Sequence, residues 1–281
     1  MQNSVQPART VAAIHDMSGV GRCALTVAIP VISALGAQVC PVPTAVLSAH
    51  TAFQGVAVRD LTDFLRTYLE HWRQLDLRFD AVYTGYLASP AQAEIVREFL
   101  EDQPQAMKVI DPVMGDGGRM YRGLEASMPA RMRGLCGGAD LITPNLTEYA
   151  LLTGEPYDES PRSEAQAQAM LERLQRETGA RAVLITSLPV AGGLANASLT
   201  EAGDFDLVRF ERLPASFPGT GDLFTSVITG ALLAGDSLAA AVRRATEFVR
   251  RTIEVTLECG TDPRFGVQLE RTLGLLMGER D

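Results

Sequence analysis

Short apolar runs that alternate with longer amphipathic segments constrain the fold of this chain more than any other feature. Runs typical of buried strands lie at 10–14, 38–42, 81–84, 108–110, 141–143 and 182–186. Helical periodicity lies between them, at 22–35, 61–75, 90–101, 125–136 and 145–178. Strands and helices in alternation favour a mostly parallel sheet with helices on both faces, so the pattern predicts an α/β fold of three layers.

The pattern changes after residue 186. A Gly-rich stretch at 192–193 precedes an alternating strand at 205–210, which indicates a hairpin, and the segment 222–276 is mostly helical in character. Neither a linker, a low-complexity segment nor an internal repeat interrupts the 281 residues. We therefore expect one domain that spans residues 1–281.

The composition excludes several partners and enzyme classes. A net charge of −9 without a basic patch disfavours nucleic acid and anionic membrane surfaces. Prolines and glycines interrupt the uncharged stretch 23–58, and no basic-then-apolar leader is present, so we predict neither a membrane span nor a signal peptide. Lys108, the only lysine, lies outside the motifs of P-loop kinases, protein kinases and pyridoxal-phosphate enzymes.

The four cysteines show no CxxC spacing, and the three histidines show no HxxH or HExxH pairing. We therefore expect neither a zinc site nor a disulfide framework. Reduced thiols are typical of a cytoplasmic protein, which is the compartment we predict.

Polar residues gather at the carboxyl ends of the predicted strands. They are His15, Asp16, Thr44, Tyr86 (which follows Gly85), Asp111, Asn145, Glu148 and Ser187. In open parallel sheets ligands bind beyond these ends, so the sequence predicts a site along one rim of the sheet.

Two glycine-rich segments could each bind phosphate. The first, GVGRCA at 19–24, matches a dinucleotide fingerprint in letters only, because four residues separate it from the strand and no acidic residue lies between Asp16 and Asp60 to bind a ribose. The second, PGTGDLF at 218–224, precedes an apolar helix whose N-terminal N–H groups can hold an anion without lysine. Asp222 there is either a helix cap or a base that takes the proton of a hydroxyl attacking the phosphoryl group.

Four motifs in this order and at these distances resemble the ribokinase-like superfamily, and within it the pyridoxal kinase branch. They are DPVMGDGG at 111–118, ITPNLTE at 142–148, ITS at 185–187 and GTGD at 219–222. The resemblance covers nearly the whole chain. It implies a ribokinase-like three-layer sandwich and transfer of the γ-phosphoryl group of MgATP to a ring hydroxymethyl group, as in B6 vitamers or hydroxymethylpyrimidine.

The resemblance also implies roles for individual residues. Asp222 becomes the catalytic base, and the amides of Gly219, Thr220 and Gly221 become the anion hole. The residues implied to organise Mg²⁺ and the phosphates are Asp111, Asp116, Thr143, Asn145 and Glu148, and those implied to contact ATP are Asn145, Thr186, Ser187 and Thr220. Asn145 and Glu148 also have the spacing of a helix cap and its capping-box partner, and both roles are compatible. Residues 188–203 would form a lid over ATP.

For the acceptor ring the resemblance implies Asp16, Thr44 and Tyr86, with Ser48 and His50 as weaker candidates. Tyr86 and His50 have structural alternatives, as a core residue and a satisfied structural histidine. Asp16 departs from the pattern, because many pyridoxal kinases have Ser there. A carboxylate only accepts hydrogen bonds, so we expect it to favour a protonated ring nitrogen or an amine, and hence pyridoxamine or an aminopyrimidine.

Three alternatives to a B6 vitamer kinase remain at this stage. A hydroxymethylpyrimidine kinase of thiamine synthesis uses the same chemistry, although its Gly-rich turn after the first strand is usually longer than SGVG. A vitamer-binding protein without turnover is disfavoured by the intact GTGD motif and acidic residues. An oxidoreductase is disfavoured because the chain lacks the acidic residue that would bind the ribose of a dinucleotide. The resemblance further implies a homodimer and allows a monovalent cation.

Overall fold

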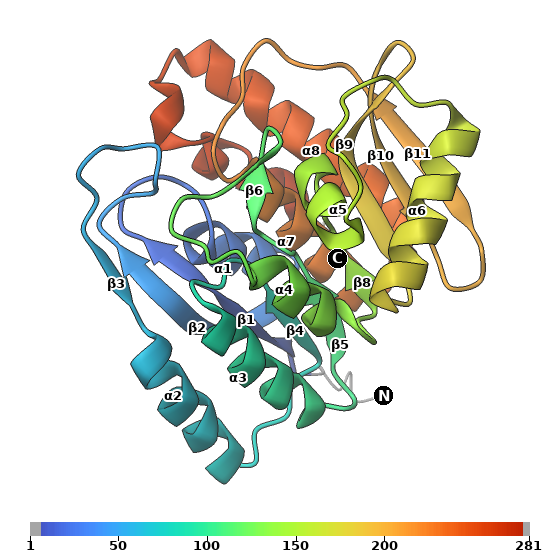
Figure 1. Cartoon of the computed structure of the whole chain (residues 1–281). Coiled ribbons are helices and arrows are strands. Elements are labelled where there is room, and N and C mark those ends of the chain that lie inside the picture. Colours follow the sequence, from blue (N-terminus) through green and yellow to red (C-terminus); the bar gives the residue numbers. More distant parts are fainter. Residues whose placement is uncertain (1–6, 278–281) are drawn as a thin grey trace, which may run out of the picture.

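A nine-stranded sheet forms the centre of the molecule, in the order β11-β10-β9-β8-β5-β4-β1-β2-β3 (Figure 1). The computed structural model of the chain describes residues 7–277. The strands of this sheet are β1 (Arg9–Ser18), β2 (Ala37–Leu47), β3 (Val58–Asp60), β4 (Ala81–Thr84), β5 (Met107–Ile110), β8 (Leu141–Ile142), β9 (Val183–Val190), β10 (Gly193–Leu199) and β11 (Phe205–Phe210). Neighbours from β2 to β9 are parallel, and β3, β10 and β11 pair antiparallel at the two edges.

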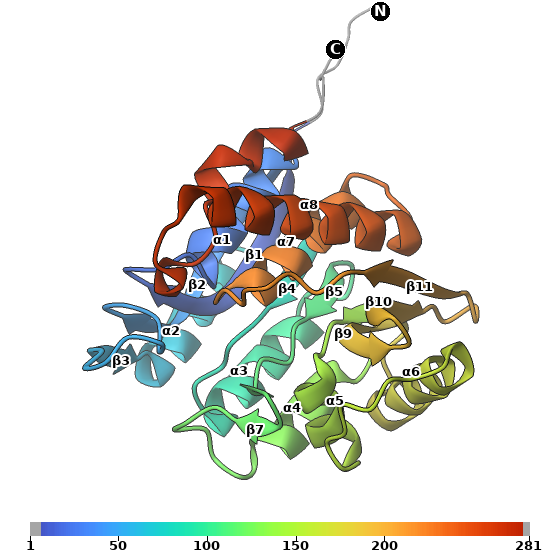
Figure 2. The same cartoon turned by 90° about the horizontal axis from the view of Figure 1, so that it is seen from above.

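Helices cover both faces of the sheet, so the predicted α/β fold is confirmed (Figure 2). One face carries α1 (Leu25–Ala34), α7 (Thr220–Leu233), α8 (Leu238–Cys259) and the 3-10 turns η1 (Pro263–Phe265), η2 (Leu269–Arg271) and η3 (Leu273–Leu276). The other carries α2 (Thr62–Gln74), α3 (Pro90–Glu101), α4 (Met128–Cys136), α5 (Leu146–Thr153) and α6 (Glu164–Thr178). None of the helices in residues 7–277 is long and apolar enough to cross a bilayer.

The strand β1 shows why the predicted strands are continuously apolar. Val11 and Ala13 pack into the core beneath α1, α7 and α8. Ala12 and Ile14 pack into the core on the opposite face. All four are fully buried, because successive side chains of a strand point to opposite faces and both faces of this sheet are covered.

Local signals define several helix ends. Ser89 caps the start of α3, with its hydroxyl accepting from the backbone N–H of Gln92, and Pro90 follows it. The predicted helix at 145–178 is two helices, α5 and α6, separated by residues 154–163. The break begins at Gly154, whose φ of 74° is the left-handed C-terminal conformation that glycine favours.

The predicted hairpin is confirmed, since β10 pairs antiparallel with both β9 and β11. Most of the segment 188–203 is strand rather than loop: it contains the end of β9 and all of β10, which is buried from Leu194 to Leu199. Only the turns at 191–192 and 200–203 lie outside the sheet. A lid over a nucleotide stays a prediction, and the turn at Gly192 is the part of the segment free to serve as one.

A second, short hairpin consists of β6 (Gly115–Asp116) and β7 (Arg119–Met120).

Candidate active site

The strands β1 and β2 continue past their predicted ends and carry the first polar residues of the rim. Their pairing is irregular there, because His15 pairs with Pro43 whereas Met17 pairs with Val46. Between these pairs β1 advances by two residues and β2 by three, so one extra residue lies beside Asp16. Such bulges redirect side chains, often next to active sites.

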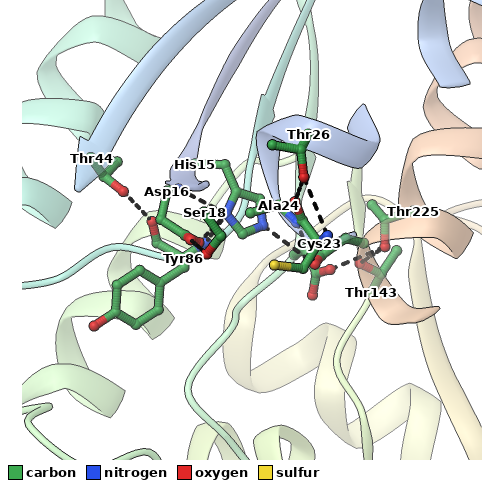
Figure 3. Close-up of polar contacts among 12 residues, drawn as sticks. His15, Asp16, Ser18, Cys23, Ala24, Thr26, Thr44, Tyr86, Thr143 and Thr225 are labelled. Carbon is green, nitrogen blue, oxygen red and sulfur yellow. Dashed lines mark hydrogen bonds and ion pairs between the residues drawn. The ribbon is translucent and has the colours of Figure 1, made fainter. Parts of the chain in front are cut away.

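His15 connects two carboxylates from distant parts of the chain (Figure 3). Its Nδ1 lies 2.9 Å from Oδ1 of Asp16, and its Nε2 lies 3.0 Å from Oδ1 of Asp222, in the first turn of α7. Ser18 donates its hydroxyl to Oδ2 of Asp16 at 3.2 Å. The backbone N–H of Ala24 donates to Oδ2 of Asp222 at 2.7 Å. The motif residue Asp222 is thus held from both sides by the N-terminal part of the chain.

The charges in this group depend on each other. Burial opposes the charged imidazole, but the carboxylates of Asp222 and Asp16 outweigh it and raise the pKa of His15 to about 10. Burial alone would raise the pKa of Asp222, but the charge of His15 and the hydrogen bonds from His15 and Ala24 hold it below its ordinary value. At neutral pH Asp222 is therefore ionised and His15 is an imidazolium.

The GTGD turn fits against the segment before α1. Gly219 has a φ of 80°, and a Cβ there would lie 2.0 Å from the carbonyl oxygen of Arg22, which only glycine avoids. Thr220, Gly221 and Asp222 form the first turn of α7, where backbone N–H groups have no intrahelical partner. Such groups, together with the helix dipole, attract an anion.

Two non-glycine residues with positive φ lie at this rim. Ala24, which donates to Asp222, has a φ of 52°, and Ser187 has a φ of 53°. A positive φ in a sparsely populated backbone region costs a non-glycine residue about 1–3 kcal/mol, and strain of this kind gathers at functional sites. Asn196 supports Ser187, because its Oδ1 accepts the Ser187 backbone N–H at 3.0 Å.

A second acidic group lies deeper in the rim, and Asp111 is its centre. Thr225 donates its hydroxyl to Oδ2 of Asp111 at 3.2 Å, and the hydroxyl of Thr143 is 3.1 Å from that of Thr225. Burial and the nearby charge of Asp222 raise the pKa of Asp111 to about 7. Burial and Asp111 likewise raise the pKa of Glu148. The ionised forms of both carboxyl groups are therefore disfavoured in this site, and a bound cation would stabilise them.

The predicted capping box of α5 is confirmed. The side chain of Asn145 accepts the backbone N–H of Glu148 at 3.0 Å, and Oε2 of Glu148 accepts the backbone N–H of Asn145 at 2.8 Å. Oε1 of Glu148 accepts the backbone N–H of Met114 at 3.0 Å, which ties the 111–118 segment to the helix. Asp116 lies apart and exposed on β6, with Oδ1 accepting from Gly117.

These residues suit a magnesium ion held mainly through water. In residues 7–277 no three His, Cys, Asp or Glu side chains converge as a ready metal centre. Glu148 already accepts two backbone N–H groups, which leaves Asp111 as the buried carboxyl group whose ionised form a cation would stabilise. Mg²⁺ keeps several waters and takes one or two carboxylates directly, so the donor set fits.

The predicted acceptor-binding residues divide into two groups. Asp16, Thr44 and Tyr86 lie together on one side of His15 in Figure 3, and Thr44 donates its hydroxyl to the Tyr86 carbonyl oxygen at 2.8 Å. Ser48 is exposed, and its hydroxyl accepts the backbone N–H of Ala57. His50 is buried beneath the 19–24 turn and contacts the carbonyl oxygen of Arg264 through Nε2. The geometry of His50 matches its structural alternative, and the role of Ser48 and His50 as substrate contacts stays a prediction.

The predicted nucleotide residues lie on neighbouring elements. Asn145 and Thr186 form a parallel bridge between the start of α5 and β9. Ser187 is the next residue of β9, and Asn196 of β10, which supports it, donates its Nδ2 to the hydroxyl of Thr246. Asn145, Thr186 and Ser187 therefore form one continuous edge beside Asp111, whereas Thr220 is on α7.

Sequence reasoning missed four residues of this rim: His15 as a bridging group, Ala24, Thr225 and Asn196. A histidine directly before an acid at a strand end was a usable signal for His15. The other three act through contacts that no local pattern reveals. Ala24 lies 198 positions from Asp222, and Thr225 lies 114 positions from Asp111. Asn196 lies 9 positions from Ser187 and 50 from Thr246.

The sequence of this chain is similar to those of known kinases. Residues 26–265 match the profile of the phosphomethylpyrimidine kinase family. A Bordetella bronchiseptica protein named pyridoxine/pyridoxal/pyridoxamine kinase is 32% identical over 267 residues, which cover 89% of this chain and 90% of that protein.

Two solved structures are similar over nearly the full length. A Bacteroides thetaiotaomicron protein described as a phosphomethylpyrimidine kinase, solved with pyridoxal, is 44% identical with a TM-score of 0.91 and 96% coverage of both chains. Pyridoxal kinase from Lactobacillus plantarum is 36% identical with a TM-score of 0.89 and 97% coverage of both chains.

Proposed function

The chain belongs to the phosphomethylpyrimidine kinase family and is a kinase, and we propose that it phosphorylates the hydroxymethyl group of B6 vitamers with ATP. The observation that carries this proposal is the position of Asp222, held by Ala24 and His15 at the rim that also bears Asp16. The relatives named for pyridoxal, and the similar structure solved with pyridoxal, support a vitamer as acceptor.

The residues divide the reaction between them. Asp222 takes the proton of the acceptor hydroxyl as its oxygen attacks the γ-phosphorus in line. The N–H groups of Gly219, Thr220 and Gly221 stabilise the negative charge on the transferred group. Because phosphoryl transfer depends mainly on positioning and charge stabilisation, a helix N-terminus can take the place of a phosphate-binding lysine, and the only lysine, Lys108, lies outside such motifs.

Asn145, Thr186, Ser187 and Thr220 would bind the nucleotide, and Asp111 would hold Mg²⁺, with Asp116, Thr143 and Glu148 acting through water. Mg²⁺ neutralises phosphate charge when bound. A monovalent cation is compatible with this acidic rim. The turn at Gly192 would cover the nucleotide and exclude water.

The specific competitor is a hydroxymethylpyrimidine kinase, which the name of the matched family favours. Both acceptors present a hydroxymethyl group on a nitrogen ring, so the same base and anion hole serve either. A vitamer-binding protein without turnover would have no need of an ionised Asp222 beside a helix N-terminus.

The test is ATP consumption with Mg²⁺ across pyridoxal, pyridoxamine, pyridoxine and hydroxymethylpyrimidine. We expect kcat/KM for at least one B6 vitamer to exceed that for hydroxymethylpyrimidine by tenfold or more. The reverse order would make the protein a hydroxymethylpyrimidine kinase. Binding of a vitamer without turnover would support the non-catalytic alternative.

Asp16 provides a test of vitamer choice. A carboxylate forms a charge-assisted hydrogen bond with a protonated nitrogen, whereas Ser forms a neutral one. Asp16→Ser is therefore expected to lower the ratio of kcat/KM for pyridoxamine over pyridoxal by about tenfold. Asp16→Asn, which keeps the size and removes the charge, is the matched control and should lower the ratio similarly. An unchanged ratio in both variants would refute the role of the charge.

We also expect a cytoplasmic homodimer that binds small molecules. Cys23, Cys40, Cys136 and Cys259 carry free thiols, consistent with a reducing compartment.

A further inference from the structure

We propose that His15 is a positioning residue for this kinase: it joins the base Asp222 and the acceptor-side carboxylate Asp16 into one hydrogen-bonded unit. The proposal rests on the proposed function and adds a residue to it. One side chain would then fix both ends of the site: the end that binds the acceptor ring and the end where the hydroxyl group of the acceptor reacts.

The hydrogen-bonding partners of His15 decide which ring nitrogen carries a proton. An ionised carboxylate only accepts, so the 3.0 Å contact with Asp222 requires a proton on Nε2. Nδ1 faces Oδ1 of Asp16, but also the backbone N–H groups of Asp16 and Tyr86, at 2.9 and 3.3 Å. Nδ1 therefore has a partner whether it is protonated or not. The contact with Asp222 is present in both states of the ring, which is what positioning of a base requires.

Packing holds the ring in this orientation. His15 is only 2% exposed, and its ring meets that of Tyr83 edge-on with centroids 6.1 Å apart. Gly85 makes room for it, since a Cβ at that position would lie 1.9 Å from Cδ2 of His15. Figure 3 shows His15 between Asp16 on one side and Ala24 on the other. Because the ring is confined in this way, His15 on β1 fixes the position of the base, Asp222, on α7.

The charge of His15 has a second consequence. The imidazolium lowers the pKa of Asp222, although burial opposes ionisation. Asp222 is buried near the carboxyl group of Asp111, so without the charge of His15 its pKa would be higher and it would protonate at higher pH. His15 thus keeps the base ionised before the acceptor binds.

Two variants separate the hydrogen bond from the charge. In His15→Gln the amide nitrogen can occupy the place of Nε2, so a neutral donor to Asp222 remains. In His15→Asn the shorter amide reaches only the place of Nδ1, so Asp16 keeps a partner and Asp222 loses one. We expect kcat to fall about tenfold in His15→Gln and about 100-fold in His15→Asn, with pyridoxal KM changed less than threefold in either.

The pH profile distinguishes this role from a structural one. The other titratable groups facing Asp222 are Asp16, Cys23, Tyr83, Asp111 and Tyr121. Burial raises the pKa of Cys23, Tyr83 and Tyr121, so these stay neutral in an assay between pH 5 and 8. The charge of His15 also lowers the pKa of Asp111, so its loss shifts the titration of both carboxyl groups in the same direction. The titrations of ATP and the vitamer are common to both enzymes and cancel in the ratio of variant to wild-type kcat/KM. We expect that ratio for His15→Gln to fall at least threefold from pH 8 to pH 5.

The controls keep this test independent of the proposed function. Vitamer turnover by the wild-type protein tests the function first, and the variants are compared on whichever acceptor it uses. Melting temperatures identify a variant that fails to fold. If a variant fails to fold, NMR titration of His15 in the wild-type protein replaces the kinetic test of that variant. We expect no protonation step of His15 below pH 9. Equal kcat in both variants with a flat pH ratio, or a His15 that titrates near pH 6.5, would overturn the proposal.

Discussion

Asp222→Asn is expected to lower kcat by about 10²–10⁴-fold, the usual contribution of a general base, with little change in melting temperature. The amide has almost the same shape as the carboxylate but cannot take the proton of the acceptor hydroxyl. Its oxygen can still accept the Ala24 N–H, and its NH₂ can donate to an unprotonated Nε2 of His15. The fold therefore keeps both contacts while the chemistry loses its base. Steady-state turnover on the preferred vitamer checks the result.

The same variant has a second, independent readout. Removing one of the two carboxylate charges that raise the pKa of His15 should lower that pKa. NMR titration of the His15 ring should then show a protonation step below pH 9 that the wild-type protein lacks. A variant that keeps more than a tenth of wild-type kcat, with the His15 step shifted as expected, would show that Asp222 is a cap and pairing group rather than the base.

The sheet and most helices were predictable because each is defined by neighbouring residues. A sheet covered on both faces requires continuous apolar strands, and β4 lies at its predicted residues, Ala81–Thr84. β1 was predicted to end at Ile14 and ends at Ser18, because its pairing with β2 continues at His15 and resumes at Met17 and Ser18 beyond the bulge. Polar side chains at a strand end resemble a loop until the partner strand is known.

The candidate site was predictable only where motifs carry it. The turn at 219–222, the DPVMGDGG segment and the capping box at Asn145 are each defined by adjacent residues. The contacts that join them are not. Arg22 and Ala24 meet Gly219 and Asp222 across nearly 200 positions, and Thr225 reaches Asp111 across 114. The first contacts depend on α1 and α7 packing side by side on one face of the sheet, and the last depends on α7 packing over the end of β5, which only the tertiary structure shows.

The segment 22–24 and the GTGD turn form a single interlocked unit. The Arg22 carbonyl oxygen occupies the space where a side chain at 219 would lie, and a Cβ there would also approach Cα of Cys23 at 2.9 Å. Two residues further on, Ala24 holds Asp222. Both obstructing atoms belong to the backbone, so neither can rotate away. Any side chain at 219 must therefore move α7 relative to the N-terminal segment.

Gly219→Ala is accordingly expected to lower kcat/KM by about 100-fold or more, because displacement of α7 moves both the anion hole and the base. The methyl group also forces a non-glycine residue to a φ of 80°, which should lower the melting temperature by several degrees. Gly134→Ala in α4 is the matched control: open space surrounds its Cβ, and alanine favours the helix, so activity should persist and stability should rise slightly. If Gly219→Ala loses stability but keeps its kcat/KM, the close approach of these two segments supports the fold alone and the anion hole must be formed elsewhere.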